Sequence, residues 1–168
     1  MSIKISYHKK STKNISSNIV LFSDEKFKVN SLKNYLSNME ISYINELLKS
    51  NDLKKNLLVF EVSSKKKVII ISIKKNLKTA DIENLGAEFY GRINYGKNST
   101  YFIVSDSVIS KENNFLGYFL HGLKLKSYEF KKYKSKNKIR LITINVIANK
   151  NKIKAEQKLK FKALEEGT

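Results

Sequence analysis

The chain has 168 residues, of which 41% are hydrophobic and 11% aromatic, enough to bury the core of one ordinary globular domain. It contains no cysteine, which excludes a disulfide framework and a thiolate metal site. The longest apolar run, residues 68–73, is too short to span a membrane, and the first ten residues lack the apolar core of a secretory signal. We therefore expect a soluble cytoplasmic protein.

The net charge of +18 comes from 33 lysines and arginines against 15 acidic residues, a balance that can indicate nucleic-acid binding. All but two of these cations are lysine, the exceptions being Arg92 and Arg140. Sequence-specific readers of nucleic acids favour arginine, whose planar fork pairs bidentately with guanine and phosphate. The bias toward lysine, asparagine and isoleucine is also what an AT-rich genome encodes at permissive surface positions.

In chain order, alternating isoleucines predict an edge-like strand over residues 2–7, and residues 18–22 read as a short buried strand. Residues 23–38 carry a weaker pattern, in which Leu32, Tyr35 and Leu36 indicate a short helix. Residues 39–50 predict a clearer amphipathic helix. Its apolar face comprises Ile41, Ile44, Leu47 and Leu48.

Residues 56–62 and 67–73 are β-branched apolar runs joined by a short polar turn, which predicts neighbouring strands in a hairpin. Thr79 is then the expected N-cap of the best helix, because acidic residues follow in its first turn, where the helix dipole favours them. The buried face of this helix is expected to contain Ile82, Leu85, Gly86, Phe89 and Ile93. The small residues Gly86 and Ala87 are expected to let it approach a sheet closely.

The remaining predicted elements are a strand at residues 99–105, a helix at 111–124 and a strand at 139–148. A final helix, capped by Asn149 or Asn151, is expected to reach Glu166. Strands that alternate with helices, some apolar on both faces, predict an α/β fold. We expect one three-layer α/β/α domain with a central mixed sheet.

Residues 117–136 carry the most distinctive pattern. A helical face of Phe115, Leu116, Phe119, Leu120 and Leu123 comes first, and from Ser127 the helical spacing breaks. Aromatic residues then stand among lysines. From the residues alone, this predicts a core helix that ends in a lysine-rich loop pinned by its aromatics.

The order of these residues resembles the closing segment of the N-terminal domain of leucyl aminopeptidases, which are hexameric two-metal exopeptidases. The matching residues are Gly122, Leu123, Leu125, Ser127, Tyr128, Phe130, Tyr133, Lys134 and Lys136. Residues 159–168, LKFKALEEGT, are similar to the family helix that enters the catalytic domain. In the family a run close to Arg-Asp-Leu-Val-Asn-Glu-Pro follows at once.

The resemblance implies a macro-domain-like N-terminal domain over residues 1–150 and the start of a linking helix over residues 151–168, with the catalytic domain absent from this chain. The domain's implied role is structural or regulatory within a hexamer. The full-length enzyme would bind two divalent metals, zinc or manganese, through its C-terminal half, where the family carries an Asn-Thr-Asp-Ala-Glu-Gly-Arg run. This chain has no such run, so we assign it no catalytic or metal-binding residue and no cofactor.

The other candidates for chemistry are few. His8 and His121 are the only histidines. His121 is expected to lie on its helix without a nearby carboxylate or thiol, and therefore to be packed or partly exposed. The serines have no histidine–acid arrangement to activate them. The glycines at 86, 91 and 96 fit neither a dinucleotide-binding nor a P-loop spacing.

Two alternatives stay open. The basic segments 124–140 and 150–162 could form a nucleic-acid-binding stripe with aromatics between the charges, giving salt-sensitive affinity for DNA. Its candidate residues are Lys124, Lys126, Lys131, Lys132, Lys134, Lys136, Lys138 and Arg140. The third possibility is an ADP-ribose-like ligand, which the implied similarity to macro domains raises, although fold alone does not confer function.

Overall fold

One mixed sheet forms the centre of the molecule. The structure is a computed structural model, and it describes residues 3–9, 15–93, 99–109, 114–133 and 141–148. The strands are β1 (Ile3–Lys9), β2 (Asn18–Asp24), β3 (Leu57–Glu61), β4 (Lys67–Ile73), β5 (Ser99–Val104) and β6 (Ile142–Ala148). They lie in the order β1-β6-β5-β2-β4-β3. Neighbouring strands are parallel, except that β3 runs antiparallel to β4 in the predicted hairpin.

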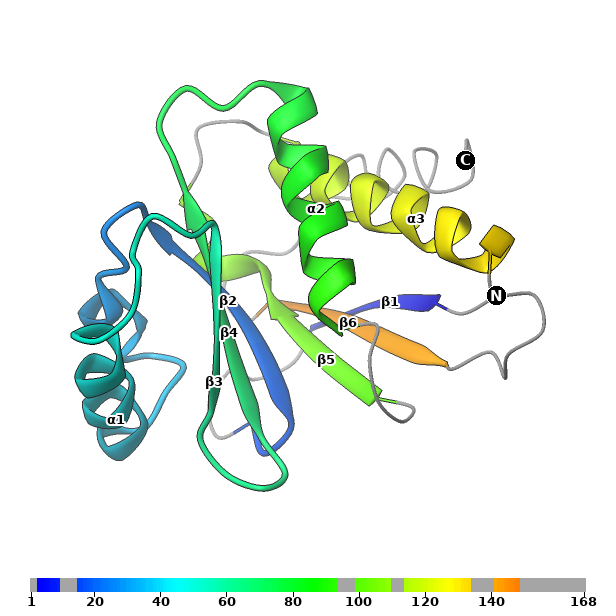
Figure 1. The fold of residues 1–168 in the computed structure, drawn as a ribbon. Coiled ribbons are helices and arrows are strands. Elements are labelled where there is room, and N and C mark those ends of the chain that lie inside the picture. Colours follow the sequence, from blue (N-terminus) through cyan, green and yellow to red (C-terminus); the bar gives the residue numbers. More distant parts are fainter. Residues whose placement is uncertain (1–2, 10–14, 94–98, 110–113, 134–140, 149–168) are drawn as a thin grey trace.

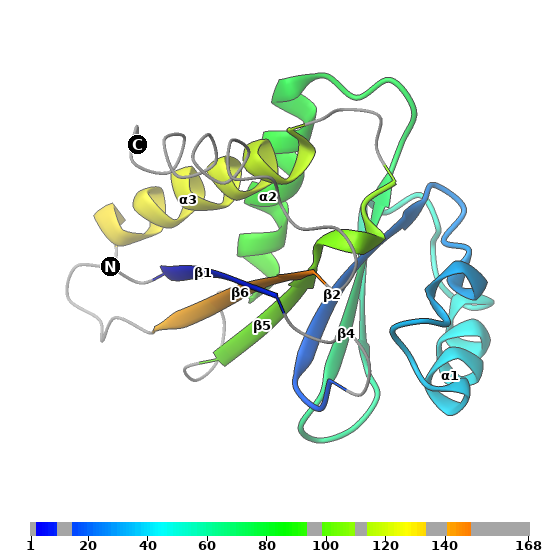
Figure 2. The ribbon, with the colours of Figure 1, turned by 180° about the vertical axis from the view of Figure 1, so that it is seen from behind.

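Helices cover both faces of this sheet (Figures 1 and 2). The helices α2 (Thr79–Ile93) and α3 (Phe115–Tyr133) lie on one face. The helix α1 (Asn38–Leu48) and the short 3-10 helix η1 (Val29–Leu32) lie on the other. The predicted fold class, a three-layer α/β/α domain around a central mixed sheet, is therefore confirmed. Among the described residues, no helix is long and apolar enough to cross a membrane.

The central strand β2 shows why its sequence is apolar on both faces. Val20 and Phe22 pack with α2 and α3, whereas Ile19 and Leu21 pack with α1 and η1. The ring of Phe22 meets Phe119 of α3 edge-on, with the ring centroids 5.4 Å apart. A parallel strand covered on both faces buries its central side chains on both sides, so residues 19–22 read as a continuous apolar run.

The prediction for the end of α3 was wrong. The helix begins at Phe115 rather than at residue 111 and continues to Tyr133, through the stretch predicted to be a loop. Ser127 explains the broken pattern, because it is buried yet polar, and its hydroxyl donates a 2.7 Å hydrogen bond to the carbonyl of Lys124 one turn earlier. A serine satisfied in this way can occupy a buried helical position.

Two smaller predictions also need correction. The helix expected between residues 23 and 38 is only the single 3-10 turn η1. Thr79 is the first helical residue of α2 rather than its N-cap. The carbonyl of Lys78 accepts the first helical bond from the amide of Ile82, and the Asp81 carboxylate accepts the Lys78 amide at 2.9 Å. The predicted final helix lies outside the described residues.

Glycines set the distance between α2 and α3. A Cβ atom on Gly86 would lie 1.9 Å from the backbone oxygen of Phe119, and a Cβ on Gly122 would lie 1.9 Å from the backbone oxygen of Glu83. Gly86 therefore allows close approach to α3, not to the sheet as its sequence position suggested. The two backbones touch at this crossing, and no other residue type fits there without separating the helices.

This contact predicts the outcome of three alanine substitutions. Gly86→Ala and Gly122→Ala should each lower the free energy of unfolding by about 3 kcal/mol, the upper range for overpacking a core, because backbone atoms cannot yield as side chains do. Gly91→Ala, on the same helix as Gly86, has nothing within 4 Å of the new Cβ. It should raise stability by up to about 1 kcal/mol through helix propensity. Urea unfolding measures all three, and equal stabilities would contradict the close crossing.

Candidate functional site

The helix crossing brings the one described histidine–carboxylate pair together. His121 Nδ1 of α3 lies 3.2 Å from Glu83 Oε1 of α2, and both side chains are partly buried, with 20% and 29% exposed. The interpretation that His121 has no nearby carboxylate was therefore wrong. The two residues are 38 positions apart, and only the packing of α2 against α3 makes them neighbours.

The surroundings of this pair favour a structural role. Glu83 also supplies the backbone oxygen that touches Gly122, so the side-chain contact spans the same crossing. In the part of the chain that the structure describes, no group of three or more histidine, cysteine, aspartate or glutamate side chains could hold a metal ion. The other histidine, His8, is exposed on β1. The His121–Glu83 contact thus acts as a polar clamp between helices.

Serine hydroxyls connect neighbouring strands near the C-terminal ends of the parallel strands. Ser107, in the short 3-10 helix η2 (Ser105–Ser107), donates to the carbonyl of Val104 at 2.7 Å and accepts the Phe22 amide at 3.1 Å. Ser105 donates to the carbonyl of Ile147 at 3.1 Å. Both hydroxyls hydrogen-bond to backbone groups where β2 and β5 diverge. This structural role argues against either serine as a nucleophile.

Tyr35 lies near Asp106, which follows the C-terminal end of β5. Burial raises the pKa of its hydroxyl, and the nearby charge of Asp106 raises it further. Ligands of open α/β sheets bind outside the carboxyl ends of parallel strands, so this is where the third alternative would place an ADP-ribose-like ligand. That alternative stays a prediction.

The residues that carry the aminopeptidase resemblance lie mainly along α3. Gly122, Leu123 and Ser127 are buried, Tyr128 is partly buried, and Leu125 is exposed. Phe130 and Tyr133 belong to the last turns of α3, and Lys134 and Lys136 lie outside the described residues. Two residues of the motif, Gly122 and Leu123, lie at the α2–α3 contact, which the sequence pattern did not reveal.

The proposed basic stripe is only partly described. Lys124 is 8% exposed and Lys126 is partly buried. Lys131 and Lys132 lie in the last turns of α3. The remaining candidates and the segment 150–162 lie outside the described residues. Nucleic-acid binding by this stripe therefore stays a prediction.

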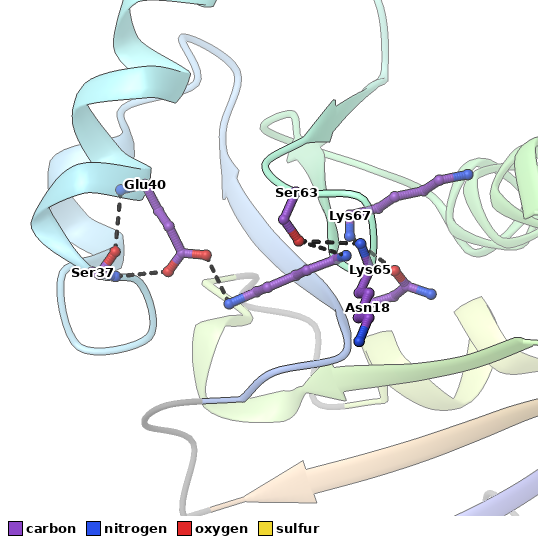
Figure 3. A network of polar contacts seen from close by, with 7 residues as sticks. Asn18, Ser37, Glu40, Ser63, Lys65 and Lys67 are labelled. Atoms are coloured by element: carbon purple, nitrogen blue, oxygen red, sulfur yellow. Dashed lines mark hydrogen bonds and ion pairs between the residues drawn. The ribbon is translucent and has the colours of Figure 1, made fainter.

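A polar network ties α1 to the β3–β4 hairpin (Figure 3). Ser37 and Glu40 form a capping box at the start of α1. The Ser37 amide donates to Glu40 Oε1 at 3.0 Å, and the Glu40 amide donates to Ser37 Oγ at 3.2 Å. The second carboxylate oxygen of Glu40 meets Lys66 Nζ at 2.8 Å. In the hairpin turn, Ser63 Oγ accepts the amides of Lys65 and Lys66.

This network lowers the pKa of Glu40. Partial burial acts to raise the pKa, but the hydrogen bond and charge of Lys66 and the hydrogen bonds from Ser37 outweigh it. The ion pair joins the layer formed by α1 to the β3–β4 hairpin. Its role is to hold the hairpin turn and the first turn of α1 in one arrangement.

Comparison with known proteins gives a fold-level match. No protein-family model matches the sequence, and no curated protein sequence matches it. Among solved structures, the chain is similar to a mutant of tomato leucine aminopeptidase, with a TM-score of 0.65 and 13% sequence identity. The match covers 97% of this chain and 35% of that chain. This chain thus spans about a third of the length of the tomato enzyme, and at this identity the likeness concerns the fold.

The Glu40 network predicts a pH-dependent contribution to stability. Because the folded pKa is lowered, the contribution is complete above the ordinary glutamate pKa of about 4.3 and is lost as pH falls through the folded value. Glu40→Gln should cost on the order of 1 kcal/mol at pH 7, as expected for a partly exposed pair. The difference from the wild type should vanish at low pH.

Urea unfolding between pH 7 and pH 3 measures this difference. Glu46→Gln, at an exposed position of the same helix, is the matched control and should change stability by less than about 0.5 kcal/mol. A Glu40→Gln variant with the same stability as the wild type at pH 7 would contradict a stabilising role for the network.

Proposed function

We propose that this chain is the N-terminal domain of a leucyl aminopeptidase whose catalytic domain follows it in the full-length protein. The observation that supports this most strongly is the fold likeness, which covers nearly all of this chain and about a third of the tomato enzyme. The ordered motif on α3, from Gly122 to Tyr133, supports it independently, because it came from residue order and not from shape.

In this proposal the domain is architectural. It flanks the catalytic domain, contributes to the outer surface of a cytoplasmic hexamer and limits access to the active site. The two divalent metals, zinc or manganese, bind to the C-terminal half of the full-length enzyme, which removes N-terminal residues from peptides. Two-metal hydrolysis needs several carboxylates around the cations. The missing half would supply them.

The proposal is tested by extending the chain. The reading frame should continue beyond Thr168 into an Asn-Thr-Asp-Ala-Glu-Gly-Arg run, and the extended protein should hydrolyse leucine p-nitroanilide when zinc or manganese is added. The 168-residue chain should not hydrolyse it with either metal. A frame that lacks the run, or an extended protein that is inactive with both metals, would sink the proposal.

The second candidate function is nucleic-acid binding. The observation that favours it is the distribution of charge along the sequence. Segment 124–140 carries eight cations and one acidic residue, and segment 150–162 carries six cations and one acidic residue. Concentrated lysines attract phosphates without reading base sequence.

Duplex binding measured at several salt concentrations tests this candidate. The logarithm of the binding constant should fall linearly with the logarithm of salt, by about 0.9 for each phosphate contact. Changing Lys131, Lys132, Lys134 and Lys136 to glutamine should reduce that slope. The control changes four lysines elsewhere, Lys26, Lys28, Lys49 and Lys54, and removes the same charge. Equal losses in both variants would show that only the net charge matters.

A further inference from the structure

The outer edge of β3 has backbone groups for which the described residues supply no backbone partner. Hydrogen bonds just beyond the two ends of β3 fix the pattern: the Ser72 amide donates to the Asn56 carbonyl at 2.8 Å, and the Val62 amide donates to the Lys66 carbonyl at 3.2 Å. Bonded residues alternate in an antiparallel ladder, so residues 56, 58, 60 and 62 bond toward β4. The amides and carbonyls of Leu57, Val59 and Glu61 therefore point away from β4. Leu57 is only 1% exposed, so the accessible groups are those of Val59 and Glu61.

No described element occupies this edge. β3 is the last strand of the sheet order, and within the described residues no backbone partner reaches Leu57, Val59 or Glu61 from the outer side. The strand lacks proline, and its register with β4 is uninterrupted across all five residues. These are the features of an edge that can accept another strand.

The side chains of β3 add an apolar contact at the centre of this edge. Leu57, Leu58 and Phe60 are buried and anchor β3 in the core, whereas Val59 is 38% exposed. Val59 shares a face with Leu57, on the side of α2 and α3. A neighbouring strand would place one apolar side chain beside Val59, and such cross-strand pairs stabilise a sheet.

Lysines stand at both ends of the strand. Lys54 and Lys55 precede β3, Lys65 lies in the hairpin turn after it, and all three are exposed. The acidic residue at the edge, Glu61, already lies 4.0 Å from Lys67. This arrangement favours an incoming segment that carries carboxylates near its two ends.

We propose that the outer edge of β3 binds an extended acidic segment of a partner protein as an additional strand. The segment would exchange backbone hydrogen bonds with Val59 and Glu61, place an apolar residue beside Val59, and set carboxylates near Lys54, Lys55 and Lys65. A second copy of this chain is the poorer occupant, because each copy carries a net charge of +18 and like charges oppose association. This inference does not depend on the proposed aminopeptidase function.

The test uses the full 168-residue chain and a fluorescein-labelled peptide, Glu-Glu-Thr-Val-Thr-Glu-Glu, in anisotropy titrations at about 150 mM salt, where long-range attraction is screened. The same peptide with its central amides N-methylated keeps every charge but cannot donate backbone bonds. We expect it to bind the wild-type chain at least about tenfold more weakly, the equivalent of one to two lost hydrogen bonds.

Val59→Pro makes the reciprocal change in the protein. The Val59 amide points outward, so proline removes a donor at the edge and leaves the β3–β4 ladder intact. It should weaken binding at least about tenfold, whereas Val59→Thr, which keeps the amide, should stay within about twofold. Circular dichroism and thermal unfolding check that the proline variant is folded.

Two results would overturn the proposal. The first is equal binding of the N-methylated and unmodified peptides to the wild-type chain. It would mean that the peptide binds through charge attraction alone, and this comparison needs no protein variant. The second comes from sedimentation: a dimer that Val59→Pro abolishes and the acidic peptide does not dissociate would assign the edge to a second copy.

Discussion

The contact between α2 and α3 at Gly86 and Gly122 is the constraint on which the rest of this fold depends. Each glycine faces a backbone oxygen of the other helix, at a distance that a side chain would exclude. The crossing sets how closely the two helices can lie, and it positions Phe89 and Phe119, whose ring centroids are 5.6 Å apart. Those rings fill the space between the helices and the sheet. The His121–Glu83 contact is a consequence of the same crossing, since it joins the same two turns.

The opposite face of the sheet is held in a different way. There α1 and η1 pack through aliphatic residues such as Ile44 and Leu32, and the Glu40–Lys66 contact adds a polar tie to the hairpin. Apolar packing is non-directional, whereas a capping box and an ion pair specify one arrangement of the groups they join. The helix layer of α1 therefore has both a core and a defined orientation relative to β3 and β4.

Several polar groups that sequence reasoning weighed for chemistry are committed to the fold. Ser105 and Ser107 bond to strand ends, Ser127 bonds within α3, and His121 pairs with Glu83. A domain built in this way suits the architectural role that we propose. Its surfaces, and above all the open edge of β3, are then where interactions with other molecules are expected.

The sequence by itself determined the α/β class, the strand positions and the β3–β4 hairpin, because alternation and apolar runs are local signals. It did not predict that α3 continues beyond Ser127. A buried serine breaks the apolar pattern, although its hydroxyl donates a hydrogen bond to the Lys124 carbonyl within the helix. The Glu83–His121 contact and the backbone contacts of Gly86 with Phe119 and of Gly122 with Glu83 were equally hidden, because they join residues far apart in the chain. Only the tertiary structure decided these contacts and the strand order that leaves β3 at an edge, since both arise from how the elements pack.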